Sequence, residues 1–415
     1  MKNTYPFPKI SIDHALGTPT IVQPPLPLCT FATPGAPIMP APSLDTCVFS
    51  EPQVALTYTA AIGIAGWLPD SQRLLVTRDI PGINRQAIET LDIRTGRIHV
   101  YAERGGANGK PIWLSGLDTV AYSTLVGQQH ELWISQRDPT QAEQIAQSVQ
   151  GLSLAADPDG QRLLYFTSLA SDQPRLQDVA TRTELVMPLD LAHWKYPKYP
   201  ESVQRLLGFS VFRIAWQPNG SYLVFYTQPW TFLFDMMTNQ ACDIDLGRFM
   251  EGMVEIMPIW ALEAKWSPDG HYLALITTGS APGKASGTGW GIQSTELTIV
   301  NVKTGALRTL QLAPDINPGQ HYVTDIDWAP DSRYLAALVV VGIDEMGSEQ
   351  GGMFIVDATT GEFQRGPSSY DFGGGPWGWQ LAWSPDGAQL AVNCPTPEVG
   401  RLCIIPVHFK GSQEK

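Results

Sequence analysis

The sequence predicts an all-β protein, a seven-bladed β-propeller whose blades are four-stranded antiparallel sheets. Two observations carry this prediction: a turn motif that recurs along the chain, and a strand pattern that follows each copy. The motif is clearest where an apolar run ends in Trp266 and continues as Ser-Pro-Asp-Gly. The equivalent positions are Trp67, Trp113, Ala156, Trp216, Trp266, Trp328 and Trp383. Their spacing suits four strands plus loops better than the shorter repeats of most solenoids.

Each copy of the motif has the chemistry of a tight β-hairpin. In the clearest copy, Pro268 fixes φ at the first turn position, Asp269 can accept hydrogen bonds from backbone amides ahead of it, and Gly270 suits the left-handed conformation. The residues that follow alternate between apolar and polar, as a half-buried strand does. A third strand is expected at 296–302 and a fourth at 307–312, joined by a Lys-Thr-Gly turn. The repeat is therefore one four-stranded blade.

These residues resemble the TolB-like family of β-propellers, whose PD40 (WD40-like) repeat carries the same Trp-Ser-Pro-Asp-Gly turn and apolar strand. The resemblance covers about residues 55–409 and implies the propeller fold. It implies no single function, because propellers serve many unrelated ones. The sequence departs from TolB itself, since residues 1–50 are too few and too proline-rich for the α/β domain that precedes the TolB propeller. A peptidase domain, as in related prolyl-oligopeptidase-like enzymes, does not fit in the remaining residues either.

We expect three regions along the chain. Residues 1–50 hold ten of the 34 prolines and predict a proline-rich extension or tether with polyproline-like conformation. Residues 51–409 are expected to form the propeller, and 410–415 a C-terminal tail. The last blade has only three strands before the chain ends, so we expect the N-terminal segment 53–59 to add its fourth strand and close the ring.

Composition excludes some classes of partner. The net charge of −13 and the pI near 4.9 argue against nucleic acid and against anionic membrane surfaces. The sequence contains no run of 18 uncharged apolar residues, so no transmembrane segment is predicted. The first residues lack a signal-peptide pattern, which leaves a cytoplasmic protein or a chain whose export signal is absent. The proline-rich segment ahead of a TolB-like propeller favours a periplasmic or extracellular protein, as on exported bacterial proteins.

The positions of the five cysteines suggest two disulfides but are also compatible with five reduced thiols. Cys394 and Cys403 flank a short loop of the last blade and would face each other in an antiparallel pair. Cys29 and Cys47, both in the extension, are the second predicted pair, which leaves Cys242 unpaired. In the alternative, all five are reduced and buried.

Function is expected in the loops, because the repeated Trp and Asp residues are explained by folding. The short Pro-Asp-Gly and Thr-Gly turns should share one end of the ring, and the long, aromatic-rich connections the other. We therefore predict a non-catalytic scaffold that binds a protein, peptide or glycan, although the aromatic rings would alternatively pin the loops in place. The predicted ligand-binding residues are Trp194, Tyr196, Tyr199, Trp230, Trp260, Trp290, Tyr322, Tyr370, Trp377 and Trp379.

Catalysis has less support from the sequence. There is no Gly-x-Ser-x-Gly elbow, His-Glu-x-x-His, Cys-x-x-Cys or phosphate-binding glycine loop. The alternative function is a metal-assisted lyase or hydrolase at the mouth of the propeller channel, with His130, His193 and His321 as speculative metal ligands. Apart from that possible metal, no cofactor is expected, and the oligomeric state is left open.

Overall fold

The computed structural model describes most of the repeat region and short parts of the N-terminal extension, and the statements below concern these residues. They are 29, 44, 47–105, 109–167, 173–187, 213–227, 230–246, 248–251, 255–258, 261–278, 295–312, 321–343, 349–366, 380–394 and 400–409.

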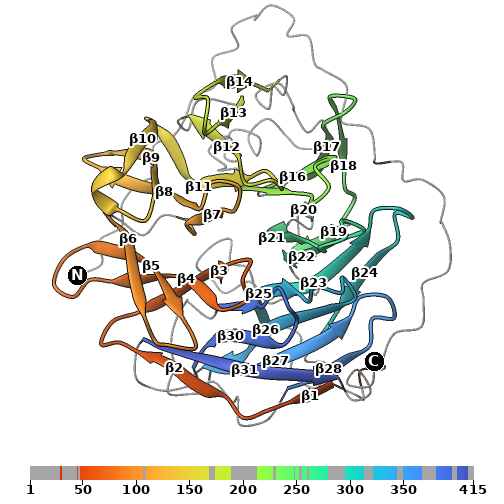
Figure 1. The fold of residues 1–415 in the computed structure, drawn as a ribbon. Helices are drawn as coiled ribbons and strands as arrows, with labels where there is room; N and C mark the ends of the chain where they lie inside the picture. Colours follow the sequence, from red (N-terminus) through yellow and green to blue (C-terminus); the bar gives the residue numbers. More distant parts are fainter. Residues whose placement is uncertain are drawn as a thin grey trace, which may run out of the picture.

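The structure is a seven-bladed propeller of four-stranded antiparallel blades, as predicted. Figure 1 shows the sheets arranged around a central axis, with the innermost strand of each blade nearest that axis. The strands of blades one to three are β3 (Ile62–Trp67), β4 (Arg73–Asp79), β5 (Arg85–Asp92), β6 (Ile98–Gly105), β7 (Ile112–Leu114), β8 (Thr119–Val126), β9 (Gln129–Ser135), β10 (Glu143–Ala146), β11 (Val149–Ala156), β12 (Arg162–Thr167), β13 (Pro174–Asp178) and β14 (Glu184–Val186).

Blades four to six repeat the same order. Their strands are β15 (Arg213–Trp216), β16 (Tyr222–Thr227), β17 (Trp230–Asp235), β18 (Gln240–Asp243), β21 (Ala261–Trp266), β22 (Tyr272–Thr278), β23 (Thr295–Asn301), β24 (Leu307–Leu310), β25 (His321–Trp328), β26 (Tyr334–Ile343), β27 (Glu349–Asp357) and β28 (Phe363–Arg365). A separate hairpin of β19 (Arg248–Glu251) and β20 (Glu255–Pro258) lies in the connection between blades four and five. The sequence analysis treated that connection as a loop.

The last blade closes the ring with strands from both ends of the chain. Its own strands are β29 (Leu381–Trp383), β30 (Gln389–Asn393) and β31 (Arg401–Phe409). The predicted closing segment forms β2 (Gln53–Thr57), which pairs antiparallel with the first half of β31. A further strand, β1 (Cys47–Phe49), pairs with the second half of β31 (Figure 1). The closing strand was predicted, whereas β1 lies within the segment assigned to the extension.

The hairpin chemistry predicted for the repeat is present. Asp269 Oδ1 accepts a hydrogen bond from the amide of His271 at 2.9 Å, and Gly270 has φ of +70°. The Ser that follows the Trp has its own role, because Ser267 Oγ accepts from the amide of Tyr272 at 2.9 Å. Ser384 Oγ makes the equivalent bond to the amide of Gln389 at 3.0 Å. The Ser therefore pairs a backbone amide that the tight turn would otherwise leave without a partner.

Three of the repeated Trp residues, Trp67, Trp266 and Trp328, donate hydrogen bonds to neighbouring blades. The indole nitrogen of Trp328 donates to the carbonyl of Lys265 at 3.0 Å, and that of Trp266 to the carbonyl of Ala215 at 3.1 Å. Each bond runs from one blade to the innermost strand of the preceding blade. Trp67 makes the same contact across the ring closure, donating to the carbonyl of Ala382 at 2.9 Å. The inner edge of an innermost strand has carbonyls unused by its own sheet, and these three indoles supply donors for three of them.

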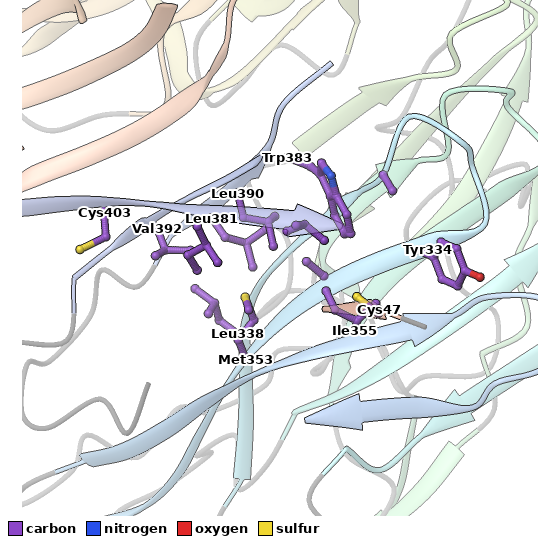
Figure 2. Packing of buried hydrophobic residues seen from close by; sticks show 14 of the residues in the cluster. Cys47, Tyr334, Leu338, Met353, Ile355, Leu381, Trp383, Leu390, Val392 and Cys403 are labelled. Carbon is purple, nitrogen blue, oxygen red and sulfur yellow. The ribbon is translucent and has the colours of Figure 1, made fainter. Parts of the chain in front are cut away.

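Apolar cores fill the spaces between adjacent blades. Figure 2 shows the cluster between blades six and seven, where Trp383 and Leu390 pack with Leu338 and Met353. Cys47 of β1 lies in the same cluster. Similar clusters lie between the blades of each of the six remaining neighbouring pairs. This burial stabilises the ring by the ordinary hydrophobic effect, and each blade depends on both neighbours.

One predicted disulfide is present and the other is wrong. Cys394 and Cys403 are bonded, as expected from their place on neighbouring strands. Cys29 is bonded to Cys242 on β18, not to Cys47. The amide of Cys29 also donates to the carbonyl of Asp243 at 3.1 Å, so the extension is held against the outer edge of blade four. Cys47 is a buried free thiol, and burial raises its pKa to about 12.

Candidate functional site

A hollow of about 570 Å³ opens at one end of the central channel. Its walls include the beginnings of the innermost strands β3, β7 and β15 and the end of the second strand β4. In an antiparallel blade these strand ends lie away from the Pro-Asp-Gly hairpins. The hollow is therefore at the end of the ring that carries the long connections, which we call the long-loop end; the opposite end, with the short turns, is the short-turn end.

Glu263 lines the hollow from blade five and is held by two donors. Tyr226 donates its hydroxyl to Glu263 Oε1 at 3.0 Å, and Arg213 Nη1 lies 3.4 Å from Oε2. Burial, followed by the charge of Glu263, raises the pKa of Tyr226 well above its usual value, so the phenol stays protonated. A β-bulge in β21 places Leu262 as an extra residue directly before Glu263. Bulges re-aim side chains in this way beside many sites.

Arg104 lines the hollow from β6 of blade one. It is only 2% exposed, and its guanidinium donates to Gln86 Oε1 at 2.9 Å and to the carbonyl of Gly109 at 2.8 Å. Gln86 in turn donates to Asp79 Oδ1 at 2.8 Å. Burial lowers the pKa of Arg104 to about 10, which leaves it charged at neutral pH. The bond to Gly109 fixes the backbone directly before Lys110.

Lys110 links the hollow to a charge cluster around the buried Asp325. Its ammonium lies 3.5 Å from Asp325 Oδ2, and Lys265 lies 3.5 Å from Asp325 Oδ1 and 3.3 Å from Asp327 Oδ1. Asp325 also accepts from the amide of Leu381 at 3.0 Å. Burial would raise the pKa of Asp325, but the charges of Lys110 and Lys265 and these amides outweigh it and lower the pKa. The cluster joins the innermost strands of blades five, six and seven.

Most of the predicted aromatic site lies outside the described residues. That applies to Trp194, Tyr196, Tyr199, Trp260, Trp290, Tyr370, Trp377 and Trp379. Trp230 is the first residue of β17, and Tyr322 is the second residue of β25 and partly buried. The prediction that these rings form a binding surface remains a prediction.

The predicted histidine site is described only in part. His130 lies on β9, the third strand of blade two, and is not among the described residues that line the hollow. His321 begins β25, and His193 is outside the described residues. Within the described ranges, no three His, Cys, Asp or Glu side chains are grouped as a metal site would require.

The sequence analysis missed the polar residues that line the hollow. Lys110, Arg213, Glu263 and Gln380 all lie on innermost strands or within two residues before them. A signal was available for Glu263, because it lies three residues before a repeat Trp in a strand that is otherwise largely apolar. No such motif marks the other three.

Comparison with known proteins supports the fold. No protein-family model matches the sequence, and no curated protein matches it either. Among solved structures, the oligogalacturonate lyase from Vibrio parahaemolyticus superposes with a TM-score of 0.52 and 11% identity, covering 87% of this chain and 97% of the other. The likeness is one of fold alone.

Two other propellers superpose less well. The propeller domain of Cps50 (Swd1) from Myceliophteria thermophila has a TM-score of 0.46 at 15% identity, covering 86% of this chain and 98% of the other. TolB from Acinetobacter baumannii has a TM-score of 0.39 at 15% identity, covering 78% of each chain. Across the described residues, no helix has the length and apolar character needed to cross a membrane.

Proposed function

We propose that this protein is a binding scaffold with TolB-like repeats, and that a protein segment, peptide or glycan binds in the hollow at its long-loop end. The observation that carries the proposal is the hollow itself. Its volume of about 570 Å³ falls within the range of small-ligand pockets. Its lining combines backbone with charged and amide side chains such as Lys110 and Gln380, which can orient a polar ligand.

The test is a binding screen with a blocking variant. Purified full-length protein is applied to peptide and glycan arrays, and every ligand found is measured again with Ala61→Trp. Ala61 lines the hollow and is exposed, so the indole would fill the space without entering a core. Ala306→Trp is the matched control, because Ala306 is exposed beside a turn of the short-turn end. We expect Ala61→Trp alone to abolish binding; ligands that bind both variants equally would contradict the proposal.

The alternative function, a metal-assisted lyase or hydrolase at the channel mouth, is kept as a second outcome of the same work. The speculative ligands are His130, His193 and His321, and the likeness to a lyase extends to fold alone. Metal analysis of the purified protein, followed by repetition with His321→Ala, tests it. Stoichiometric metal that is lost in this variant would favour the enzyme.

We also propose that the protein is periplasmic or extracellular. The support is chemical: the chain has two disulfides, and disulfides persist in oxidising compartments. Counting free thiols in protein isolated from its native source tests this. One reactive thiol after unfolding, from Cys47, is expected for an exported protein, whereas five would indicate a reducing compartment.

A further inference from the structure

We propose that the ligand of the hollow carries a carboxylate, which Lys110 and Arg213 bind. The inference rests on the proposed function, because it names the chemical class of the ligand for the same hollow. It is argued from the balance of charge, from the occupancy of the acceptors and from the availability of the donors.

The balance of charge at the hollow differs from that of the whole chain. The chain has 27 Lys and Arg against 40 Asp and Glu, so its general field repels anions. Among the charged residues that line the hollow, the cations are Arg104, Lys110 and Arg213, and the anions are Asp79 and Glu263. The lining therefore has one more cation than anions, in a chain whose net charge is −13.

The carboxylates of the hollow already have donors. Glu263 accepts from Tyr226 at one oxygen and faces Arg213 at the other. Asp79 Oδ1 accepts from the side-chain nitrogen Nε2 of Gln86. A cationic ligand would have to compete with these bonds, whereas an anionic ligand would leave them in place.

The two cations are partly exposed and have unused donors in the described structure. The side chain of Lys110 is 41% exposed, and its described polar contact is the long one to Asp325, at 3.5 Å. The side chain of Arg213 is 43% exposed, and its described bonds all use Nη1, including one of 2.9 Å to the carbonyl of Leu262. Nε and Nη2 are then available for the paired geometry in which a guanidinium binds a carboxylate.

Arg104 positions Lys110. Its bond to the carbonyl of Gly109 holds the backbone at the beginning of β7, and its bond to Gln86 ties that backbone to blade one. The guanidinium is buried and remains charged, so it adds positive potential beside the hollow. The Lys110 ammonium is thereby presented from a fixed backbone at the edge of the hollow.

The experiment compares matched ligands that differ only in the carboxylate. One pair is a hexapeptide with a free C-terminal carboxylate and its amidated form, in which every side chain is uncharged. The other pair is a uronic-acid trisaccharide and its methyl ester. Binding is measured by calorimetry for the full-length protein, for Lys110→Met and for Arg213→Gln. Lys303→Met is the matched control, because Lys303 is exposed on a turn of the short-turn end.

The acid of at least one pair should bind more tightly than its neutral form. Lys110→Met and Arg213→Gln should each weaken that acid about tenfold or more and leave the neutral form unchanged, as expected for loss of a charged hydrogen bond. Lys303→Met should have no effect. The pair that shows this difference identifies the source of the carboxylate.

Two results would overturn the inference while leaving the proposed function intact. In the first, neutral ligands bind as tightly as acids and Ala61→Trp still abolishes binding. In the second, acids bind but Lys110→Met and Arg213→Gln bind them as the native protein does. Binding that survives Ala61→Trp would instead contradict the proposed function itself.

Discussion

The two ends of the ring are built from the same strands but differ in what their side chains do. At the short-turn end, turns bond to turns: Ser332 Oγ accepts from the amide of Asp269 at 2.8 Å, and Gln217 Nε2 donates to the carbonyl of Gly270 at 2.7 Å. At the long-loop end, side chains such as Lys110 border an open hollow. The short-turn end uses its polar groups to join blades, whereas the long-loop end leaves some of them partly exposed beside the hollow.

The difference follows from where the sequence repeats. Most blades carry a version of the turn motif, with the full Trp-Ser-Pro-Asp-Gly in blades five and seven, so neighbouring blades present similar turns at the short-turn end. The connections at the long-loop end have no repeated motif and differ in length and composition. Because the turns at the short-turn end hydrogen-bond to one another, the connections at the long-loop end can differ in sequence without breaking these bonds.

Replacing a repeat Trp should have the largest effect on the free energy of unfolding. Trp328 is 5% exposed and packs between blades five and six. Trp328→Ala should lower the free energy of unfolding by about 3–5 kcal/mol, as large-to-small core substitutions do. Urea denaturation measures it, and a loss below about 1 kcal/mol would show that the repeat Trp does not hold the ring together.

A matched pair separates the hydrogen bond of the Trp from its bulk. The indole of Trp328 donates to the carbonyl of Lys265, whereas the buried indole nitrogen of Trp216 has no partner among the described residues. Trp328→Phe should therefore destabilise the protein more than Trp216→Phe, by about 1 kcal/mol. Equal losses would contradict a role for this bond.

Acid should loosen the short-turn end through Asp357. This carboxylate is 1% exposed and accepts from Arg333 and from Thr359. Burial would raise its pKa, but the bonds from Arg333 and Thr359 outweigh it and lower the pKa. A carboxyl with a lowered pKa in the folded state stabilises above its unfolded pKa of about 3.9, and that contribution is lost as pH falls through the folded value.

The variant Asp357→Asn tests this pH dependence. At pH 7 it should lower the free energy of unfolding by about 2 kcal/mol, because it weakens charged hydrogen bonds in a buried site. The difference from the native protein should shrink as pH falls below about 4. Asp92→Asn is the control, since Asp92 caps the equivalent turn of blade one from a more exposed position. A difference that stays constant down to pH 2 would contradict the assignment.

A small stability effect is expected at the long-loop end. Lys110→Met should lower the free energy of unfolding by about 0.5–1 kcal/mol, because its ion pair to the buried Asp325 is long and Lys265 remains beside that carboxylate. Lys303→Met should change it by less than about 0.5 kcal/mol, because Lys303 is exposed. Thermal unfolding of both variants at equal protein concentration measures this, and a large loss for Lys110→Met would make that residue structural.

The repeat made the fold predictable, because the residues of the motif determine the conformation of their own turn. The left-handed Gly270 and the amide acceptor Asp269 are turn chemistry, so the hairpins were expected, and the strand count of the last blade predicted closure by 53–59. The pairing of Cys29 was not predictable in this way. Its partner Cys242 is 213 residues away, on a blade that only the folded ring brings beside the extension.

The hollow was predictable in place but not in composition. Counting strands located the long-loop end, and the sequence analysis then favoured aromatic residues in the long connections. The described lining mixes apolar residues with the charged residues Lys110, Arg213 and Glu263, and the only aromatic residue in it is Tyr226. Glu263 follows a bulge in β21. A bulge depends on the pairing with the neighbouring strand, and no local motif in this sequence predicts it.

The most direct test of the account is lysine acetylation in the presence and absence of a ligand obtained from the array screen, read by mass spectrometry. Lys110 borders the hollow at the long-loop end, and Lys303 lies on a turn of the short-turn end. The account predicts that saturating ligand slows acetylation of Lys110 and leaves that of Lys303 unchanged. Protection of Lys303 with no change at Lys110 would contradict it.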